Sequence, residues 1–251
     1  MRLFGLIGYP LQHSFSPEWF RDKFEKENID AEYQLFPIRS ISEFPPLMEK
    51  HPRLEGVNVT IPYKQDIIPF LDDIRDEALS VKAVNTVAIE NRVHGSKKSI
   101  GYNTDVYGFE QSVKPLIKPH HRKALILGTG GSSKTVAYVL NRLGLEVLFV
   151  SRRTPEDEHT IGYNELSRQM IQEYKVIINT TPLGMYPKVA SKPEIPYEGI
   201  DKDHLLYDLV YNPSTTTFLE EGRKRSAALK NGYQMLCLQA ERSWQIWNAA
   251  V

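Results

Sequence analysis

Residues 124–153 read ALILGTGGSSKTVAYVLNRLGLEVLFVSRR, and this stretch decides the fold class. Ala124 to Leu127 is a short apolar run, and a glycine-rich turn follows it at once. Helical apolar spacing runs from Lys134 to Leu143, Gly144 ends it, and Glu146 to Val150 is apolar again. This order predicts a buried parallel strand, a turn, a helix and a second strand. Because such a turn presents backbone N–H groups and a helix N-terminus to a pyrophosphate, we expect a dinucleotide-binding unit.

The residues after the second strand indicate which dinucleotide is bound. About twenty residues beyond such a turn, NAD-dependent enzymes place an acid on the ribose 2′-hydroxyl. This chain has Ser151-Arg152-Arg153 at that point. A carboxylate would repel a 2′-phosphate, whereas guanidinium groups pair with it bidentately. We therefore expect NADP as the cofactor.

The same turn also comes close to a nucleotide-binding P-loop. Gly128 to Thr135 departs from the pattern G-x-x-x-x-G-K-[ST] only where Ser133 replaces the second glycine. His204 to Asp208 could then supply an apolar strand that ends in a metal-binding aspartate. Against this, Ser133 would obstruct a loop that wraps phosphates with bare backbone. A P-loop phosphotransferase stays as a distant alternative.

Composition limits the possible partners. The 251 residues carry 31 Lys and Arg against 31 Asp and Glu, and this balance disfavours nucleic acid or a membrane surface, which attract a basic excess. The single cysteine, Cys237, suits a reducing compartment. No apolar run is long enough to span a bilayer, and Leu3 to Ile7 is too short for a signal-peptide core. We expect a cytoplasmic protein with a small-molecule substrate.

The histidines give no sign of a metal site. The seven of them lack metal-ligand spacing, and one cysteine forms no thiolate cluster. His120 and His121 lie in a polar stretch that we interpret as a solvated connector. We expect no bound metal.

The first half of the chain has the pattern of a mixed α/β domain. Ser16 followed by Pro17 predicts a helix start with the serine as N-cap. Residues 56–61 alternate, so that Val57, Val59 and Ile61 are expected on one face. The expected strands, with a hairpin turn at 91–95, are 3–7, 31–38, 56–61, 83–90 and 100–105.

The second half continues the parallel pattern. Further buried strands are expected at 175–179 and 205–210, and a last helix at 235–250 with an apolar face. The predicted fold class is a two-domain α/β protein, with an N-terminal mixed α/β substrate domain and a Rossmann-type parallel-sheet NADP domain. The expected bounds are 1–108 with 231–251 for the substrate domain, and 109–230 for the cofactor domain.

A set of polar residues gathers where the first-half strands end. Each has a structural explanation, such as a helix cap or a solvent-facing position. Together they offer hydroxyls, amides, one amine and one carboxylate, which suit a small polyhydroxylated molecule. Beside a hydride carrier, a Lys/Asp pair can act as general acid–base at a carbinol or carbonyl carbon. The set is Ser14, Ser16, Asn58, Thr60, Lys64, Asn85, Asn103 and Asp105.

These motifs and their order resemble the shikimate dehydrogenase family over nearly the whole length. In the first half they are Gly8-Tyr-Pro10, Ser14-Phe-Ser16-Pro17, Gly56-Val-Asn-Val-Thr-Ile-Pro-Tyr-Lys64, Ala83-Val-Asn-Thr86 and Gly101-Tyr-Asn-Thr-Asp105 with Gly108. In the second half they are the glycine turn, Ser151-Arg152, Asn179-Thr-Thr-Pro-Leu-Gly-Met185, Asp208-Leu-Val-Tyr211 and Asn231-Gly232 with Gln239-Ala240. So many ordered matches favour the dinucleotide unit over the P-loop.

The resemblance implies the reversible, NADP-dependent interconversion of 3-dehydroshikimate and shikimate, a step of aromatic amino-acid biosynthesis. It implies that Lys64 and Asp105 form the catalytic pair beside the reacting C3 oxygen. Asn58 would either help to hold that pair or make a structural hydrogen bond. The substrate-binding residues implied are Ser14, Ser16 and Tyr211 for the carboxylate, Thr60 nearby, and Asn85, Asp105, Gln239 and Lys64 for the ring oxygens.

The resemblance also implies a set of cofactor-binding residues. Val210 and Gly232 would approach the nicotinamide through their backbones, and Thr180 belongs to the set. The pyrophosphate would be bound by Gly128, Thr129, Gly130, Gly131, Ser132 and Ser133, and the 2′-phosphate by Ser151, Arg152 and Arg153.

Departures from the family pattern leave alternatives open. The turn of the family is usually Gly-Ala-Gly-Gly-Ala, whereas Thr129 and Ser132 are polar here. Residues 154–159 are acidic and turn-like where the family often has a helix with another basic residue. The nearest alternative is a quinate/shikimate dehydrogenase that uses NAD, and a non-catalytic dinucleotide-sensing protein is more distant. We expect a monomer or a homodimer.

Overall fold

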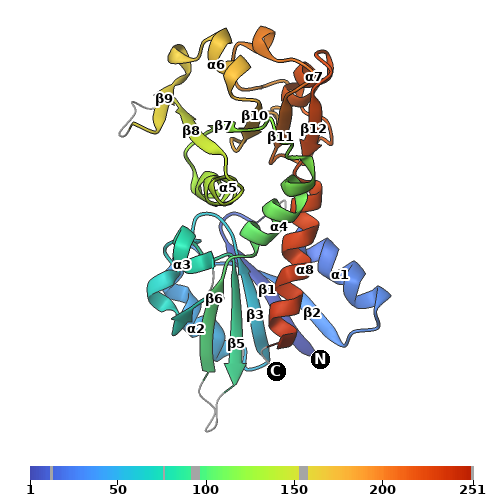
Figure 1. The fold of residues 1–251 in the computed structure, drawn as a ribbon. Helices are drawn as coiled ribbons and strands as arrows, with labels where there is room; N and C mark the ends of the chain where they lie inside the picture. Colours follow the sequence, from blue (N-terminus) through green and yellow to red (C-terminus); the bar gives the residue numbers. More distant parts are fainter. Residues whose placement is uncertain (12–13, 76, 92–96, 153–157, 250–251) are drawn as a thin grey trace. The chain divides into compact units, whose positions relative to one another are not determined.

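The structure is a computed structural model, and it describes residues 1–11, 14–75, 77–91, 97–152 and 158–249 (Figure 1). The chain divides into two compact units, Met1–Tyr107 with Cys237–Val251, and Gly108–Leu236. Helices α4 (Thr104–Val113) and α8 (Tyr233–Ala249) each contribute residues to both units. Within the described residues, no helix is long and apolar enough to cross a membrane.

The first unit is built on a mixed six-stranded sheet in the order β2-β1-β3-β5-β6-β4. β1 lies parallel to β2 and β3, whereas β5 runs antiparallel to both β3 and β6. The expected hairpin is therefore present, and its turn at 92–96 lies outside the described residues. The strands are β1 (Arg2–Gly8), β2 (Ala31–Pro37), β3 (Leu54–Val59), β4 (Asp73–Ile74), β5 (Thr86–Asn91) and β6 (Lys97–Tyr102).

Helices cover both faces of this sheet (Figure 1). α1 (Ser16–Lys26) and α8 pack on one face around Phe4, Phe20 and Trp247. α2 (Phe44–Lys50) and α3 (Glu77–Val81) cover the other face, where Phe44, Val57 and other buried residues form the larger cluster. Trp247 also donates its indole N–H to the Val87 carbonyl at 3.0 Å. The last helix is therefore fixed to a central strand of the sheet.

One edge of this sheet gathers several segments of the chain. Val59 ends β3, β5 begins at Thr86, and Thr86 pairs with both Asn58 and Tyr102. Because β1 runs parallel to β3, its carboxyl end reaches the same edge. The segments after β1, β3 and β6 therefore meet there. They carry five of the predicted substrate residues, Ser14, Ser16, Thr60, Lys64 and Asp105, and Asn85 directly precedes β5 at the same edge.

The second unit is a six-stranded sheet in which every strand pairs in parallel. The spatial order β9-β8-β7-β10-β11-β12 corresponds to 3-2-1-4-5-6 in sequence order, the arrangement of dinucleotide-binding α/β folds. The expected fold class is confirmed. The strands are β7 (Lys123–Leu127), β8 (Glu146–Ser151), β9 (Thr160–Gly162), β10 (Val176–Asn179), β11 (Leu205–Asp208) and β12 (Ala228–Asn231).

Helices again lie on both faces of the second sheet. α6 (Arg168–Glu173) and α7 (Thr217–Arg223) contribute Ile171 and Phe218 to a hydrophobic cluster with the strands. α5 (Gly131–Arg142) lies on the opposite face (Figure 1). Short 3-10 turns occupy 41–43, 68–70, 114–116, 163–165 and 197–199.

α5 begins three residues earlier than the apolar spacing predicts. Gly130 is its N-cap and Gly131 its first residue, whereas Lys134 was the expected start. The hydroxyl of Ser133 donates to the Gly130 carbonyl at 2.5 Å and so closes the first turn. Gly144 takes a φ of +83°, which only glycine adopts freely, and ends the helix as expected.

Three local expectations for the first unit are wrong. Ser16 is not an N-cap, because Phe15 holds that position and no side-chain cap forms. The strand expected to reach Asp105 ends at Tyr102, since α4 begins at Thr104. Ile61 lies beyond the end of β3 and is 73% exposed, so it does not share the buried face of the strand.

In the second unit, the strand expected at 205–210 ends at Asp208, and the expectation for His121 is also wrong. His121 is buried rather than part of a solvated connector. Its Nδ1 accepts from the Lys118 backbone N–H, and its Nε2 lies 3.1 Å from the Asp203 carbonyl. Burial is the main reason that the pKa of His121 is lowered, so the ring is a neutral anchor for this connection.

Candidate active site

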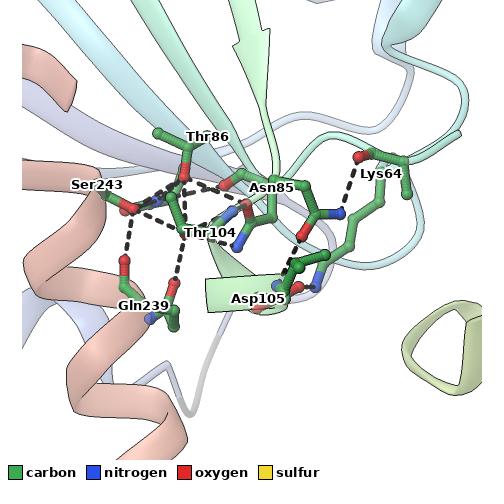
Figure 2. A network of polar contacts seen from close by, with 11 residues as sticks. Lys64, Asn85, Thr86, Thr104, Asp105, Gln239 and Ser243 are labelled. Carbon is green, nitrogen blue, oxygen red and sulfur yellow. Dashed lines mark hydrogen bonds and ion pairs between the residues drawn. The ribbon is translucent and has the colours of Figure 1, made fainter. Parts of the chain in front are cut away.

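An ion pair lies at the edge of the first sheet where the segments after β1, β3 and β6 meet. Lys64 Nζ lies 2.6 Å from Asp105 Oδ2, and the two side chains are only 23% and 14% exposed (Figure 2). The carbonyl of Lys64 accepts from the Val84 N–H at 2.7 Å, which holds the loop after β3. Asp105 occupies the first turn of α4, where the helix N-terminus stabilises a carboxylate. The structure thus brings together the two residues expected to form the catalytic pair.

The start of α4 is fixed by Asn103. Its Oδ1 accepts from the Val106 N–H at 3.1 Å, and its Nδ2 donates to the Ala83 carbonyl at 2.9 Å. An Asn cap of this kind stabilises a helix by about 1 kcal/mol. By fixing the start of α4, these bonds of Asn103 also fix the position of Asp105 in the first turn.

Five buried polar residues form a network beside the pair, which we call the amide–hydroxyl network: Asn58, Asn85, Thr86, Thr104 and Ser243. Asn85 Oδ1 accepts from the Thr104 N–H at 2.6 Å, and its Nδ2 donates to Thr104 Oγ1 at 3.0 Å. Ser243 Oγ lies 2.8 Å from Thr86 Oγ1 and 3.1 Å from Thr104 Oγ1 (Figure 2). Because buried polar groups are costly to leave unpaired, this network resists rearrangement and holds Asn85 in place.

Asn58 makes a structural set of bonds rather than contacts to the ion pair. Its Nδ2 donates to the Asn85 carbonyl, to Thr86 Oγ1 and to Ser243 Oγ. Its Oδ1 accepts from the Tyr33 hydroxyl at 2.8 Å. Asn58 thus makes the structural hydrogen bonds that one of the two interpretations expected.

The remaining substrate residues expected in the first unit are Ser14, Ser16 and Thr60 near the strand ends, and Gln239 on α8. Ser16 lies close to the Tyr33 hydroxyl, at the start of α1. Ser14 donates to the Leu11 carbonyl at 3.1 Å, and Thr60 is half-buried directly after β3. Gln239 Oε1 is 3.5 Å from Thr104 Oγ1.

The glycine turn of the second unit has the backbone that a phosphate loop needs. Gly128 takes a φ of +106°, and a Cβ there would lie 3.0 Å from both Thr180 Oγ1 and Thr181 Cγ2. A Cβ on Gly130 or Gly131 would meet nothing within 4 Å, so the backbone there is open to a ligand. Thr180 Oγ1 donates to the Leu127 carbonyl at 2.7 Å, which ties the end of β10 to the end of β7.

A cavity of about 560 Å³ opens at the carboxyl ends of the second unit's strands. Two of its lining residues, Arg152 and Lys188, are cations, and among the residues that the structure describes no lining side chain is a carboxylate. This charge and the open glycine backbone fit the phosphates of NADP. Arg153 lies outside the described residues. The cofactor residues expected from the sequence that line the cavity are Gly128, Thr129, Gly130, Ser151, Arg152 and Thr180.

Five other expected cofactor residues do not line this cavity: Gly131, Ser132, Ser133, Val210 and Gly232. The first three form the opening turn of α5. Gly232 N donates to the Val210 carbonyl at 3.3 Å, and a Cβ on Gly232 would lie 2.1 Å from the Leu209 carbonyl oxygen. Glycine is therefore required at 232 for the two loops to approach. The neighbouring Tyr211 is half-buried, and burial raises its pKa.

A second buried network organises the loops after β10 and β11. Asp208 Oδ1 accepts from Asn179 Nδ2 at 2.9 Å and from the Val210 N–H at 3.0 Å, and Oδ2 accepts from Thr216 Oγ1 at 2.6 Å. Asn179 Oδ1 in turn accepts from the hydroxyl and N–H of Thr181. Burial raises the pKa of Asp208 to about 6, although its three donors act in the opposite direction. Asp208 thus shapes the loop that begins with Val210.

Sequence reasoning missed several residues of these sites. Ser243 was hidden in an apolar helix, although it stands one turn after Gln239 on the same side. Tyr33 belongs to none of the sequence motifs. Asp208 was quoted in a family motif and as a P-loop aspartate, but its role in the loop structure was not predicted. Tyr163, which lines the cavity, gave no signal.

Within the described parts of the chain, no group of three or more His, Cys, Asp or Glu residues that could hold a metal ion is found. The chemistry available at the first unit's edge is an amine, a carboxylate and neutral hydrogen-bonding groups.

Comparison with known proteins identifies relatives. Residues 6–87 match the family model for the shikimate dehydrogenase substrate binding domain. The chain is 36% identical to the shikimate dehydrogenase (NADP(+)) of Caldanaerobacter subterraneus subsp. tengcongensis, over 98% of this chain and 91% of the relative.

Solved structures agree with this relationship. Shikimate dehydrogenase from Aquifex aeolicus is similar with a TM-score of 0.85 and 33% identity, covering 99% of this chain and 93% of the other. Quinate dehydrogenase from Corynebacterium glutamicum, solved in complex with NAD, has a TM-score of 0.85 at 25% identity, covering 99% and 94%.

Proposed function

This chain belongs to the shikimate dehydrogenase family, and from that premise we propose how it carries out the NADP-dependent interconversion of 3-dehydroshikimate and shikimate. The observation that carries the proposal is the Lys64–Asp105 ion pair, at the edge of the first sheet where the segments after β1, β3 and β6 meet. The first unit contains the stretch that matches the family's substrate binding domain. The second unit carries the glycine turn and the cationic cavity.

Lys64 supplies the proton in the reductive direction. When bound, NADPH provides the hydride that adds to the C3 carbonyl carbon of 3-dehydroshikimate. Negative charge then develops on the C3 oxygen, and the ammonium of Lys64 stabilises it and donates a proton to form the hydroxyl. Asp105 orients the ammonium through the 2.6 Å contact and keeps its charge close to the reacting oxygen. In the oxidative direction the same pair accepts the proton.

The neighbouring polar groups hold the substrate. Asn85 and Gln239 bind ring hydroxyls, Ser14 and Ser16 bind the carboxylate with Tyr211, and Thr60 lies near that group. The amide–hydroxyl network supports this assignment, because it fixes the side chain of Asn85 and contacts Gln239 through Thr104. Ring hydroxyls would then meet groups whose positions are already set, which lowers the cost of binding.

The second unit binds NADP. Gly128 to Ser133 provide open backbone and the start of α5 for the pyrophosphate. Ser151, Arg152 and Arg153 bind the 2′-phosphate, Thr180 lines the same site, and the backbones of Val210 and Gly232 approach the nicotinamide. The cavity supports this assignment, because the cations Arg152 and Lys188 line it and attract a 2′-phosphate.

A quinate/shikimate dehydrogenase that uses NAD is the second candidate. The similarity to an NAD-bound quinate dehydrogenase favours keeping it, because the two folds match with a TM-score of 0.85. Arg152 in the cavity lining favours NADP instead. We further propose a cytoplasmic monomer or homodimer with no nucleic-acid or membrane partner, which light scattering and cell fractionation would test.

Replacement of Lys64 tests the proposed chemistry. We expect Lys64→Ala to lower kcat by roughly 10²–10⁴-fold, the usual contribution of a general acid–base group, with a much smaller change in the KM for shikimate. Lys26→Ala, at an exposed position of α1, is the matched control and should behave as the unmodified protein. A raised KM with intact kcat would reduce Lys64 to a binding residue.

A further inference from the structure

Tyr163 stands beside Arg152 at the ends of two adjacent strands. β9 pairs in parallel with β8, and Gly162 is the partner of Ser151 in that register. Tyr163 and Arg152 therefore follow the ends of neighbouring strands at the same end of the sheet. Both residues line the cavity, together with Ser151. In dinucleotide-binding folds the end of the second strand meets the adenosine ribose, so Tyr163 flanks that part of the site.

The Tyr163 hydroxyl has no partner of its own. Among the residues that the structure describes, it is the one buried side-chain polar atom without a hydrogen bond. Such a group costs free energy unless a ligand or a water pairs with it. Burial raises the pKa of Tyr163 to about 12 and the nearby Arg152 charge opposes that rise, so the phenol stays protonated and can donate.

From this arrangement we propose that Tyr163 is a specificity residue, which donates its hydroxyl to the 2′-phosphate of NADP beside Arg152. A neutral donor binds an anionic oxygen without the repulsion that a carboxylate would bring. This role does not depend on other 2′-phosphate ligands after Arg152, because Tyr163 directly follows β9, whose end lies beside that of β8. The inference rests on the proposed NADP site.

Nucleotide binding without turnover tests the inference. Isothermal titration of the purified protein would measure the Kd for adenosine 2′,5′-bisphosphate and for adenosine 5′-monophosphate. We expect Tyr163→Phe to weaken binding of the bisphosphate about tenfold, the usual effect of losing a hydrogen bond to a charged group, and to leave the monophosphate unchanged. The KM for NADP⁺ should rise by a similar factor, while kcat stays within about twofold.

Tyr197→Phe is the matched control. The Tyr197 hydroxyl lies in the same hydrophobic cluster but already donates to the Pro193 carbonyl at 2.7 Å. Its loss should leave the preference for the bisphosphate unchanged. A melting curve for each variant would show that both fold.

The outcomes separate the two proposals. If the unmodified protein does not prefer the bisphosphate, the proposed NADP site fails. If it does and Tyr163→Phe keeps the full preference, the role of Tyr163 is wrong. Equal weakening of both nucleotides by Tyr163→Phe would also contradict that role, because the residue would then shape the pocket in general.

Discussion

Asp105 combines an ion pair to Lys64 with a position in the first turn of a helix, so that its carboxylate is held in one orientation. We expect Asp105→Asn to lower kcat and also to raise the KM for shikimate, because the carboxylate both orients the amine and binds a hydroxyl. Steady-state kinetics would measure both effects, with the exposed Asp22→Asn on α1 as the control. Wild-type kinetics in Asp105→Asn would remove this residue from the mechanism.

Asp208 makes folding stability depend on pH. Its pKa rises from 3.8 to about 6 on folding because the carboxyl group is buried. The folded state therefore holds a proton that the unfolded state releases, and the resulting stabilisation is present below pH 3.8 and lost as pH rises through 6. Between pH 4.5 and 7.5 this loss amounts to about 2 kcal/mol.

Urea unfolding at the two pH values, with Asp208→Asn as comparison, would measure that effect. The variant lacks the titrating group, so the unfolding free energy of the unmodified protein should fall by about 2 kcal/mol relative to it. A difference between the two proteins that does not change with pH would contradict the raised pKa.

Single residues also mark the limit of prediction from sequence. The motifs located Lys64, Asp105 and Asn85, since these follow or precede recognisable strands. Ser243 could not be found in this way, because its partners Thr86 and Thr104 lie 157 and 139 residues away along the chain. The cap role expected for Ser16 was wrong, because Phe15 holds the N-cap position of α1.

At the scale of elements, short apolar runs predicted the strands well, because each buried strand has its own local pattern. The start of α4 was missed, since it depends on the bonds of Asn103 and Thr104 to residues 83 and 85. The early start of α5 was missed because glycine and serine carry no apolar periodicity. Element ends thus depend on contacts that the local pattern does not contain.

The packing of α8 on the first sheet depends on one glycine. A Cβ on Gly56 would lie 2.2 Å from the indole nitrogen of Trp247, which donates to the Val87 carbonyl. We expect Gly56→Ala to lower the unfolding free energy by about 3 kcal/mol, through overpacking and loss of that bond. Urea unfolding would measure this, and Gly131→Ala, whose Cβ meets nothing within 4 Å, should be close to neutral. An unchanged midpoint in Gly56→Ala would show that the helix can shift without cost.

At the scale of the whole molecule, the chain joins a mixed-sheet unit and a parallel-sheet unit with the strand order of dinucleotide-binding folds. Its relatives match over nearly the whole length. The order of motifs along the chain was enough to predict this fold class, since the signal is spread over many short segments. Substrate and cofactor preference, in contrast, depend on a few side-chain atoms at the site, so they are decided by the assay that follows.

The most direct measurement is the absorbance of reduced nicotinamide during turnover by the purified protein, with shikimate or quinate paired in turn with NADP⁺ or NAD⁺. We predict strong turnover with shikimate and NADP⁺, and much weaker turnover in the other three pairings. A preference for NAD⁺ or quinate would assign the chain to the second candidate function. No turnover in any pairing would contradict the enzymatic account.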